Sequence, residues 1–124
     1  MRVNRVLLVA ALLLGVSAWS QITTGSLSGT VSDPAGAVIA GAKVTVRNQD
    51  TGQVTSLVAN EVGLFKASYL TPGKYTVRVE APGFRTTELK DIDVLLSREA
   101  VTNVMLQVGA VTETIEVQAS APLV

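Results

Sequence analysis

Apolar and polar residues follow two different patterns along the chain, one before residue 20 and another after residue 25. Before residue 20, residues 6–16 form an almost unbroken apolar run. After residue 25, apolar and polar residues alternate in short segments that Gly, Pro, Asn and Asp separate. Alternation with a period of two is typical of strands that bury one face. We therefore expect an all-β fold for the second part of the chain.

Alternation is clearest in two of these short segments. In residues 43–47 the valines fall on one face and the lysine, threonine and arginine on the other, and in residues 75–81 every second residue is apolar. Strands with one solvated face belong to antiparallel sheets, and two such sheets packed face to face make a sandwich. We predict an antiparallel β-sandwich of about seven strands. The expected strands are residues 26–32, 42–48, 54–59, 64–69, 75–81, 85–95 and 100–106, with a further candidate at 111–118.

The N-terminal apolar run has the features of an export signal. Arg2 and Arg5 precede the run, and the small residues Ala18 and Ser20 follow it in the spacing of a cleavage site. A membrane-spanning helix needs about 20 apolar residues, and this run is shorter. We expect a helical signal peptide at residues 1–20, cleavage after Ser20, and Gln21 as the first mature residue.

Composition narrows the chemistry that the mature chain can carry. The chain has no Cys and no His, which excludes disulfides, thiolate nucleophiles and imidazole ligands. Loss of Arg2 and Arg5 would leave eight basic side chains against ten acidic ones. A chain with this charge balance has no basic surface for a polyanion, so we expect no nucleic-acid partner.

A series of short motifs containing Gly and Pro runs from residue 27 to residue 84. The motifs are Leu27-Ser28-Gly29-Thr30-Val31-Ser32-Asp33, Gly36, Ile39-Ala40-Gly41-Ala42-Lys43-Val44-Thr45-Val46, Gly63-Leu64-Phe65, Leu70-Thr71-Pro72-Gly73-Lys74-Tyr75 and Ala81-Pro82-Gly83-Phe84. In type and spacing they resemble the carboxypeptidase regulatory-like domain over residues 25–106. The resemblance implies a transthyretin-like sandwich, also described as a carbohydrate-binding-like fold, that acts as an accessory domain without a cofactor. Members occur beside peptidases, in surface proteins and at the N-terminus of TonB-dependent outer-membrane receptors, including the Oar-like receptors.

Three aromatic residues and one acidic group are candidates for ligand binding. Phe65, Tyr75 and Phe84 stand at positions that face the core, so we interpret them as core rather than as a platform for sugars. Asp91 and Asp93, with Glu88 nearby, could ligate calcium, but their spacing is not that of a calcium loop. We interpret both aspartates as part of a solvated strand face.

The segment at residues 113–119 is the candidate partner-binding site. Its residues Glu113, Thr114, Ile115, Glu116 and Val117 resemble a TonB box, the acidic and apolar stretch that pairs with a periplasmic energy-transducing protein. Such pairing is β-augmentation, in which an extended segment adds to the edge of a partner's sheet through main-chain hydrogen bonds. The same residues also alternate well enough to form the last strand of the sandwich. One segment can pair in the sandwich in one state and with a partner in another.

These features lead to one main interpretation and one alternative. The main interpretation divides the chain into a signal peptide (1–20), a sandwich (21–108) and a final strand or TonB-box-like segment with the start of a linker (109–124). In that interpretation the chain is a non-catalytic accessory domain of a TonB-dependent outer-membrane receptor that lacks its plug and barrel. Its expected partners are a TonB-type protein or the plug and barrel, in the periplasm or outer membrane of a Gram-negative-type bacterium. The alternative is a free secreted module that binds carbohydrate or protein.

Overall fold

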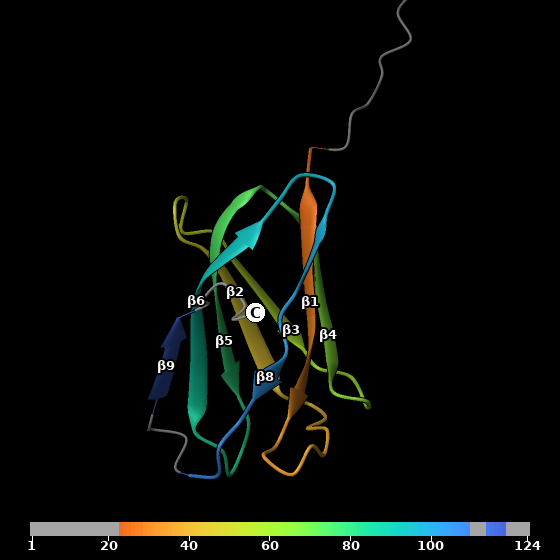
Figure 1. The fold of residues 1–124 in the computed structure, drawn as a ribbon, viewed down its shortest axis with the longest axis vertical. Helices are drawn as coiled ribbons and strands as arrows, with labels where there is room; N and C mark the ends of the chain where they lie inside the picture. Colours follow the sequence, from red (N-terminus) through yellow and green to blue (C-terminus); the bar gives the residue numbers. More distant parts are fainter. Residues whose placement is uncertain (1–22, 110–113, 119–124) are drawn as a thin grey trace, which may run out of the picture.

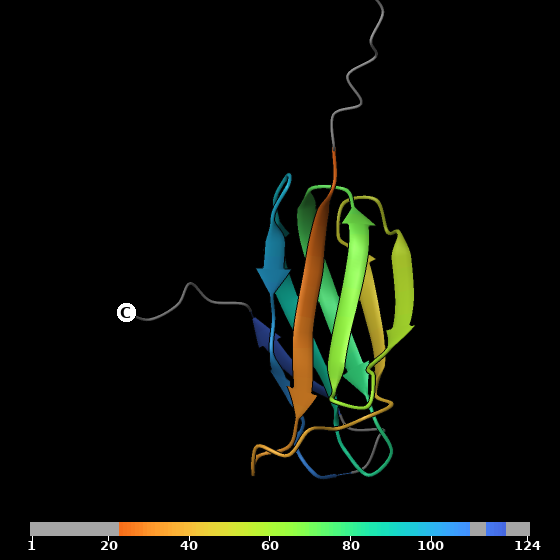
Figure 2. The same cartoon turned by 90° about the vertical axis from the view of Figure 1, so that its right-hand side faces the viewer.

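Two β-sheets packed face to face make up the fold, as Figures 1 and 2 show. The computed structural model describes residues 23–109 and 114–118, so the expected signal peptide and Glu113 lie outside the described residues. The described residues form strands, turns and loops, and none of their segments is a helix that could cross a membrane. The strands are β1 (Gly25–Ser32), β2 (Lys43–Asn48), β3 (Val54–Val58), β4 (Leu64–Leu70), β5 (Gly73–Glu80), β6 (Thr86–Val94), β7 (Glu99–Val101), β8 (Val104–Met105) and β9 (Thr114–Gln118).

The two sheets differ in width. The small sheet has the order β4-β1-β7, with the two-residue β8 pairing further along β1. The large sheet has five strands in the order β3-β2-β5-β6-β9. Alternate side chains from both sheets meet between them, and most of these are Val, Leu, Ala and Ile. The all-β sandwich of the sequence-based prediction is thus observed.

The prediction of an antiparallel sandwich is wrong for three strands. The short strands β7 and β8 run parallel to β1, and β9 runs parallel to β6. The cause is a pair of crossings between the sheets. After β6 the chain crosses to the end of the small sheet where β1 begins, and after β8 it returns to the end of the large sheet where β6 begins. A strand that arrives at the start of its neighbour must run parallel to it.

The observed bounds of the first six strands agree with the predicted bounds to within two residues. The expected strand at 100–106 is divided in two, because Thr102 and Asn103 leave the ladder between β7 and β8. There the side-chain amide oxygen of Asn103 accepts hydrogen bonds from the backbone N and the Oγ1 of Thr30, at 3.2 and 3.0 Å. A side chain thus replaces the backbone partner that β1 would otherwise have at this point.

Turns between the strands are held by side chains that bind the backbone. The Asn48 carboxamide oxygen accepts from the N–H groups of Asp50 and Thr51, and that of Asn60 accepts from Val62 and Leu64. Such contacts satisfy turn N–H groups that have no ladder partner. Turns that contain Asn and Gly therefore form at 48–52 and 60–63, where such residues separate the expected strands.

One glycine of the first motif is required by close packing. Gly29 lies at the centre of β1, where the segment between β7 and β8 and the Phe65 ring approach it. A Cβ atom at Gly29 would meet the Thr102 carbonyl oxygen at 1.7 Å and Phe65 Cζ at 2.8 Å. Because Thr102 N also donates to Ser28 O at 2.7 Å, the segment between β7 and β8 is tied to β1 and cannot move aside freely.

Gly29→Ala is therefore expected to destabilise the fold by about 2 kcal/mol or more, the upper part of the range for overpacked interiors. Gly41→Ala is the matched control, because Gly41 has φ +74° but nothing within 4 Å of its Cβ position. It should cost only about 1 kcal/mol, the strain of a left-handed backbone. Urea denaturation of the two variants measures both costs, and equal costs would contradict the close approach at Gly29.

Candidate partner-binding site

The candidate segment forms the last strand at one edge of the large sheet. Strand β9 pairs with β6 in parallel, from Thr86 opposite Thr114 to Lys90 opposite Gln118. Because β9 is the outermost strand in the sheet order, its other edge carries no strand in the described chain. Four of the five predicted site residues, from Thr114 to Val117, are thus brought to a sheet edge that is open for main-chain pairing.

The inner face of β9 is only partly covered. Ile115 and Val117 lie opposite Thr87 and Leu89 and share their inward face. Ile115 is half-buried, but Val117 remains 44% exposed. Together with Met105 and other residues of the β8 region, they line an apolar groove of ≈ 260 Å³. The large sheet therefore extends beyond the small sheet at this edge, and β9 buries little apolar surface there.

A buried hydroxyl adds to the weakness of this contact. Thr87 is only 4% exposed, and its Oγ1 has no hydrogen-bond partner in the described part of the chain. Thr87 lines the same groove as Ile115 and Val117. A buried hydroxyl without a partner costs free energy that it would recover in water. Opening of the β6–β9 contact would remove one side of the groove that Thr87 lines.

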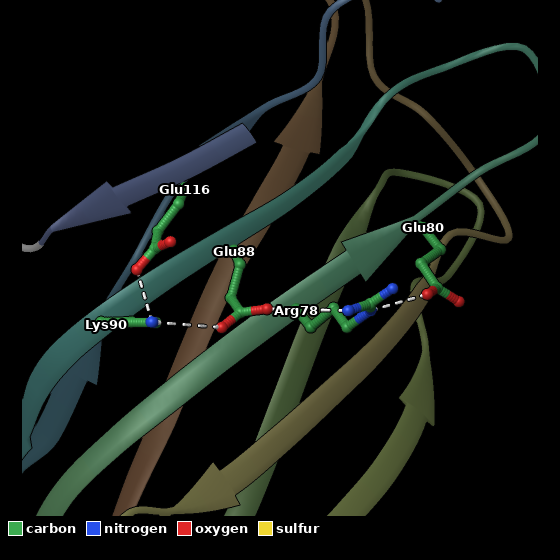
Figure 3. Close-up of polar contacts among 5 residues, drawn as sticks. All are labelled: Arg78, Glu80, Glu88, Lys90 and Glu116. Atoms are coloured by element: carbon green, nitrogen blue, oxygen red, sulfur yellow. Dashed lines mark hydrogen bonds and ion pairs between the residues drawn. The ribbon is translucent and has the colours of Figure 1, made fainter. Parts of the chain in front are cut away.

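A row of charged side chains crosses the outer face of the large sheet and reaches β9 (Figure 3). Lys90 of β6 contacts Glu116 of β9 and also Glu88, at 3.9 Å. The Glu88 carboxylate lies 3.6 Å from Arg78 Nη1, and Arg78 Nε donates to Glu80 at 2.7 Å. The Lys90–Glu116 pair is the link of this row that holds β9.

The hydrogen bond to Glu116, followed by the charge of Glu116, raises the pKa of Lys90 above its usual 10.5. A raised lysine pKa means that the folded state favours the ammonium form. This contribution is fully present below pH 10.5 and is lost as the pH rises through the higher folded-state pKa. The Lys90 and Glu116 side chains are 37% and 57% exposed, so water and salt screen the pair and its contribution is small.

The acidic candidates lie elsewhere on the large sheet. A register shift between β5 and β6 leaves Lys90 and Asp91 opposite a single residue of β5, and Asp91 has φ 60°. Such a bulge places Asp91 on the outer face together with Lys90. Asp93 accepts a hydrogen bond from Lys74 at 3.0 Å. In the described ranges no three acidic side chains gather into a cluster that could hold a metal ion.

The three aromatic residues that the sequence assigns to the core do face it, but the exposure of a fourth aromatic residue was not predicted. Phe65 of β4 and Tyr75 of β5 are buried on opposite sheets, and Phe84 is partly buried against the core. Tyr69, in contrast, is 87% exposed. Alternation from Phe65 and Ala67 predicts an inward side chain at residue 69, so the pattern contains no signal for this exposure.

Comparison with known protein sequences gives the family of this chain. The sequence profile of the carboxypeptidase regulatory-like domain matches residues 26–107. The chain belongs to this family. It is also 30% identical over 135 aligned residues to the TonB-dependent transporter Oar of Myxococcus xanthus, an alignment that covers all of this chain and 12% of that protein. This regulatory-like domain therefore spans about an eighth of the length of that relative.

Solved structures with the same fold come from proteins of diverse kinds. The Bacillus anthracis TIE protein matches 69% of this chain with a TM-score of 0.58 and 22% identity, over 17% of its own chain. A putative carbohydrate binding protein from Bacteroides uniformis matches 65% of this chain with a TM-score of 0.54 and 23% identity, over 40% of its own. Hydroxyquinol 1,2-dioxygenase from Pseudomonas putida matches 74% with a TM-score of 0.57 and 14% identity, over 59% of its own. At these identities the likeness concerns the fold alone.

Glu116→Gln is expected to loosen β9 and leave the rest of the sandwich unchanged, because it removes the charge that Lys90 contacts across the β6–β9 pair. The methyl resonances of Ile115 and Val117 should shift toward positions of a solvated segment, while those of Val44 and Val77 stay fixed. Glu80→Gln is the matched control, since Glu80 pairs with Arg78 and does not touch β9.

Alkaline pH provides an independent check of the same contact. Neutralisation of Lys90 above its raised pKa should shift the Ile115 and Val117 methyl resonances of the parent chain as Glu116→Gln does. The same pH change should have no further effect at these methyl groups in the variant. Unchanged methyl resonances in the variant would show that backbone pairing and apolar contact hold β9 without the ion pair.

Proposed function

We propose that the chain is an exported, non-catalytic accessory domain of a TonB-dependent outer-membrane transporter, and that Glu113, Thr114, Ile115, Glu116 and Val117 form its partner-binding segment. The observation that carries this proposal is the position of β9, at an open sheet edge with a partly exposed apolar face. The relationship to the Myxococcus transporter supports the type of parent protein. The proposed location is the periplasm or outer membrane, reached through the signal peptide at residues 1–20.

The proposed mechanism is exchange of one strand partner for another. In the closed state β9 pairs with β6 through main-chain hydrogen bonds, one partly exposed apolar face and an exposed ion pair. In the bound state the segment leaves β6 and adds to the sheet edge of a TonB-type periplasmic protein or of the transporter's plug and barrel. Main-chain pairing supplies affinity in both states, and Ile115 and Val117 supply the side chains that fill a partner's pockets.

Release of β9 costs little because its contact with the sandwich is weak. Among the side chains from Thr114 to Val117, only Ile115 is half-buried, and the ion pair with Lys90 is screened by water. Release of the segment would also remove Ile115 and Val117 from the groove that Thr87 lines. A partner therefore needs to supply only a modest difference in affinity to shift the population toward the open state.

Catalysis is not part of this proposal. The chain has no His and no Cys to act as base, nucleophile or soft metal ligand. Two hollows on the described surface are open and lie over sheet faces, and such open sites do not raise the pKa of an acid by burial as a general acid requires.

The alternative function is a free secreted module that binds carbohydrate or protein. Both proposals include the sandwich and the export signal. Only the main proposal requires β9 to pair with a TonB-type protein or another transporter component. The fold of a putative carbohydrate binding protein from Bacteroides uniformis is compatible with it.

Binding to the C-terminal domain of a TonB protein tests the main proposal. The purified chain should bind this domain, and Ile115→Pro should abolish binding because proline removes a main-chain donor from the segment. Ile115→Val is the matched control and should retain binding, because it keeps both the donor and an apolar side chain. Isothermal titration calorimetry measures all three chains.

Circular dichroism and thermal unfolding show whether Ile115→Pro leaves the sandwich intact, as expected for a change confined to an edge strand. Absence of binding by the parent chain, or equal binding by the folded Ile115→Pro chain, would rule out the segment as the TonB-binding site.

A further inference from the structure

Tyr69 is the single exposed aromatic side chain among the described residues. It lies near the end of β4, at the edge of the small sheet opposite to β7. Its side chain is 87% exposed, whereas the next residue, Leu70, is buried. An aromatic ring in water contributes nothing to the apolar core. Its position therefore calls for an explanation outside folding.

A bulge in β4 turns Tyr69 outward. Leu27 of β1 lies opposite Ala67, and Gly25 lies opposite Leu70, so Ser68 and Tyr69 together face the single residue Ser26. Tyr69 has φ 57°, a left-handed backbone that is unfavourable for a residue with a bulky side chain. Bulges re-aim side chains and are frequent beside functional sites, and strained residues gather at such sites.

Small hydroxyl groups surround the outward-facing ring. Tyr69 borders an open hollow of ≈ 360 Å³ that is also lined by Ser26, Ser68 and Ser97. These three side chains are short, so the surface beside the ring is low and polar. The charged residue Arg98 also lines the hollow. A ring-shaped ligand that lies against Tyr69 would be within reach of these hydroxyl groups.

A charged pair lies in the same hollow. Lys66 Nζ of β4 is 3.6 Å from Glu99 Oε1 of β7, and the pair spans β1 between them. A hydrogen bond from Ser28, followed by the charge of Lys66, lowers the pKa of Glu99, so Glu99 is an acceptor at neutral pH. Lys66 is a donor of up to three hydrogen bonds. One strong donor and one strong acceptor are thus fixed next to an exposed aromatic face.

We propose that this hollow binds a pyranose ring of a neutral oligosaccharide, with the ring stacked on Tyr69 and its hydroxyl groups bound by Lys66 and Glu99. A sugar ring has an apolar C–H face and a rim of hydroxyl groups, which matches an aromatic side chain flanked by donors and acceptors. A nucleic-acid base would also stack on Tyr69, but its phosphates would meet the carboxylate of Glu99 as well as the cations Lys66 and Arg98, whereas sugar hydroxyl groups can bind all three. Nine described residues line the hollow, far fewer than the roughly 20–30 that each partner of a stable protein pair contributes.

This site does not depend on strand exchange at β9. Tyr69 belongs to the small sheet, and β9 belongs to the large sheet. A transporter accessory domain and a free secreted module could both use the site. Its failure and the failure of TonB binding are therefore separate results.

Titration of the purified chain with four defined oligosaccharides tests the proposal. The probes are cellopentaose, xylopentaose, mannopentaose and N-acetylchitopentaose, measured by calorimetry and by NMR of the Tyr69 ring. At least one probe should bind saturably and shift the Tyr69 resonances. Tyr69→Phe should retain this binding, because it keeps the ring and removes only the hydroxyl group.

Tyr69→Asn should weaken binding roughly tenfold or more, a loss typical of a central aromatic contact. Asn adopts a left-handed backbone readily, so the variant should fold at least as well as the parent chain. Lys66→Met should also weaken binding, and Ile115→Pro should leave it unchanged. Saturable binding by none of the four probes, or full affinity in Tyr69→Asn, would overturn the proposal.

Discussion

Burial of alternate aliphatic side chains between two sheets of unequal width is the constraint on which this structure depends. The core is made of Val, Leu, Ala and Ile, with Phe65 and Tyr75 facing it from opposite sheets. Because the inner face of each sheet must be covered by the other, the narrower sheet decides which strands are well buried. Strand β9 is at the edge where the large sheet extends past the small sheet, and this position explains the exposure of Val117.

Two crossings of the chain between the sheets determine where β7 and β9 lie. The first crossing leads β7 to the side of β1, and Gly29 provides the space for the chain that follows it. The second crossing leads β9 to the side of β6. Parallel pairing at both places follows from the direction in which the chain arrives. The proposed TonB-binding strand is thus the last element added to an otherwise complete sandwich, and the proposed sugar site lies on the other sheet.

Local features of the fold were predictable from the sequence because they depend on neighbouring residues. Alternation of the valines at 44 and 46 marks β2, and Asn and Gly clusters mark the turns that flank β3. Pairing direction was not predictable in this way, since strand alternation is the same in parallel and antiparallel sheets. The two bulges were not predictable either. The bulge in β4 turns Tyr69 away from the face that strict alternation assigns to it, and the bulge in β6 places the neighbours Lys90 and Asp91 on one face.

Native-state hydrogen exchange, resolved for individual amides by NMR, tests the weak attachment of β9 most directly. The β9 amides that bond to β6 should open at least about 2 kcal/mol more readily than those at the centre of β2 and β5, as expected for a local rather than a global opening. Exchange of β9, Val44 and Val77 with one common opening free energy would contradict the account. Strand β9 would then be an integral part of the sandwich, released only when the whole domain unfolds.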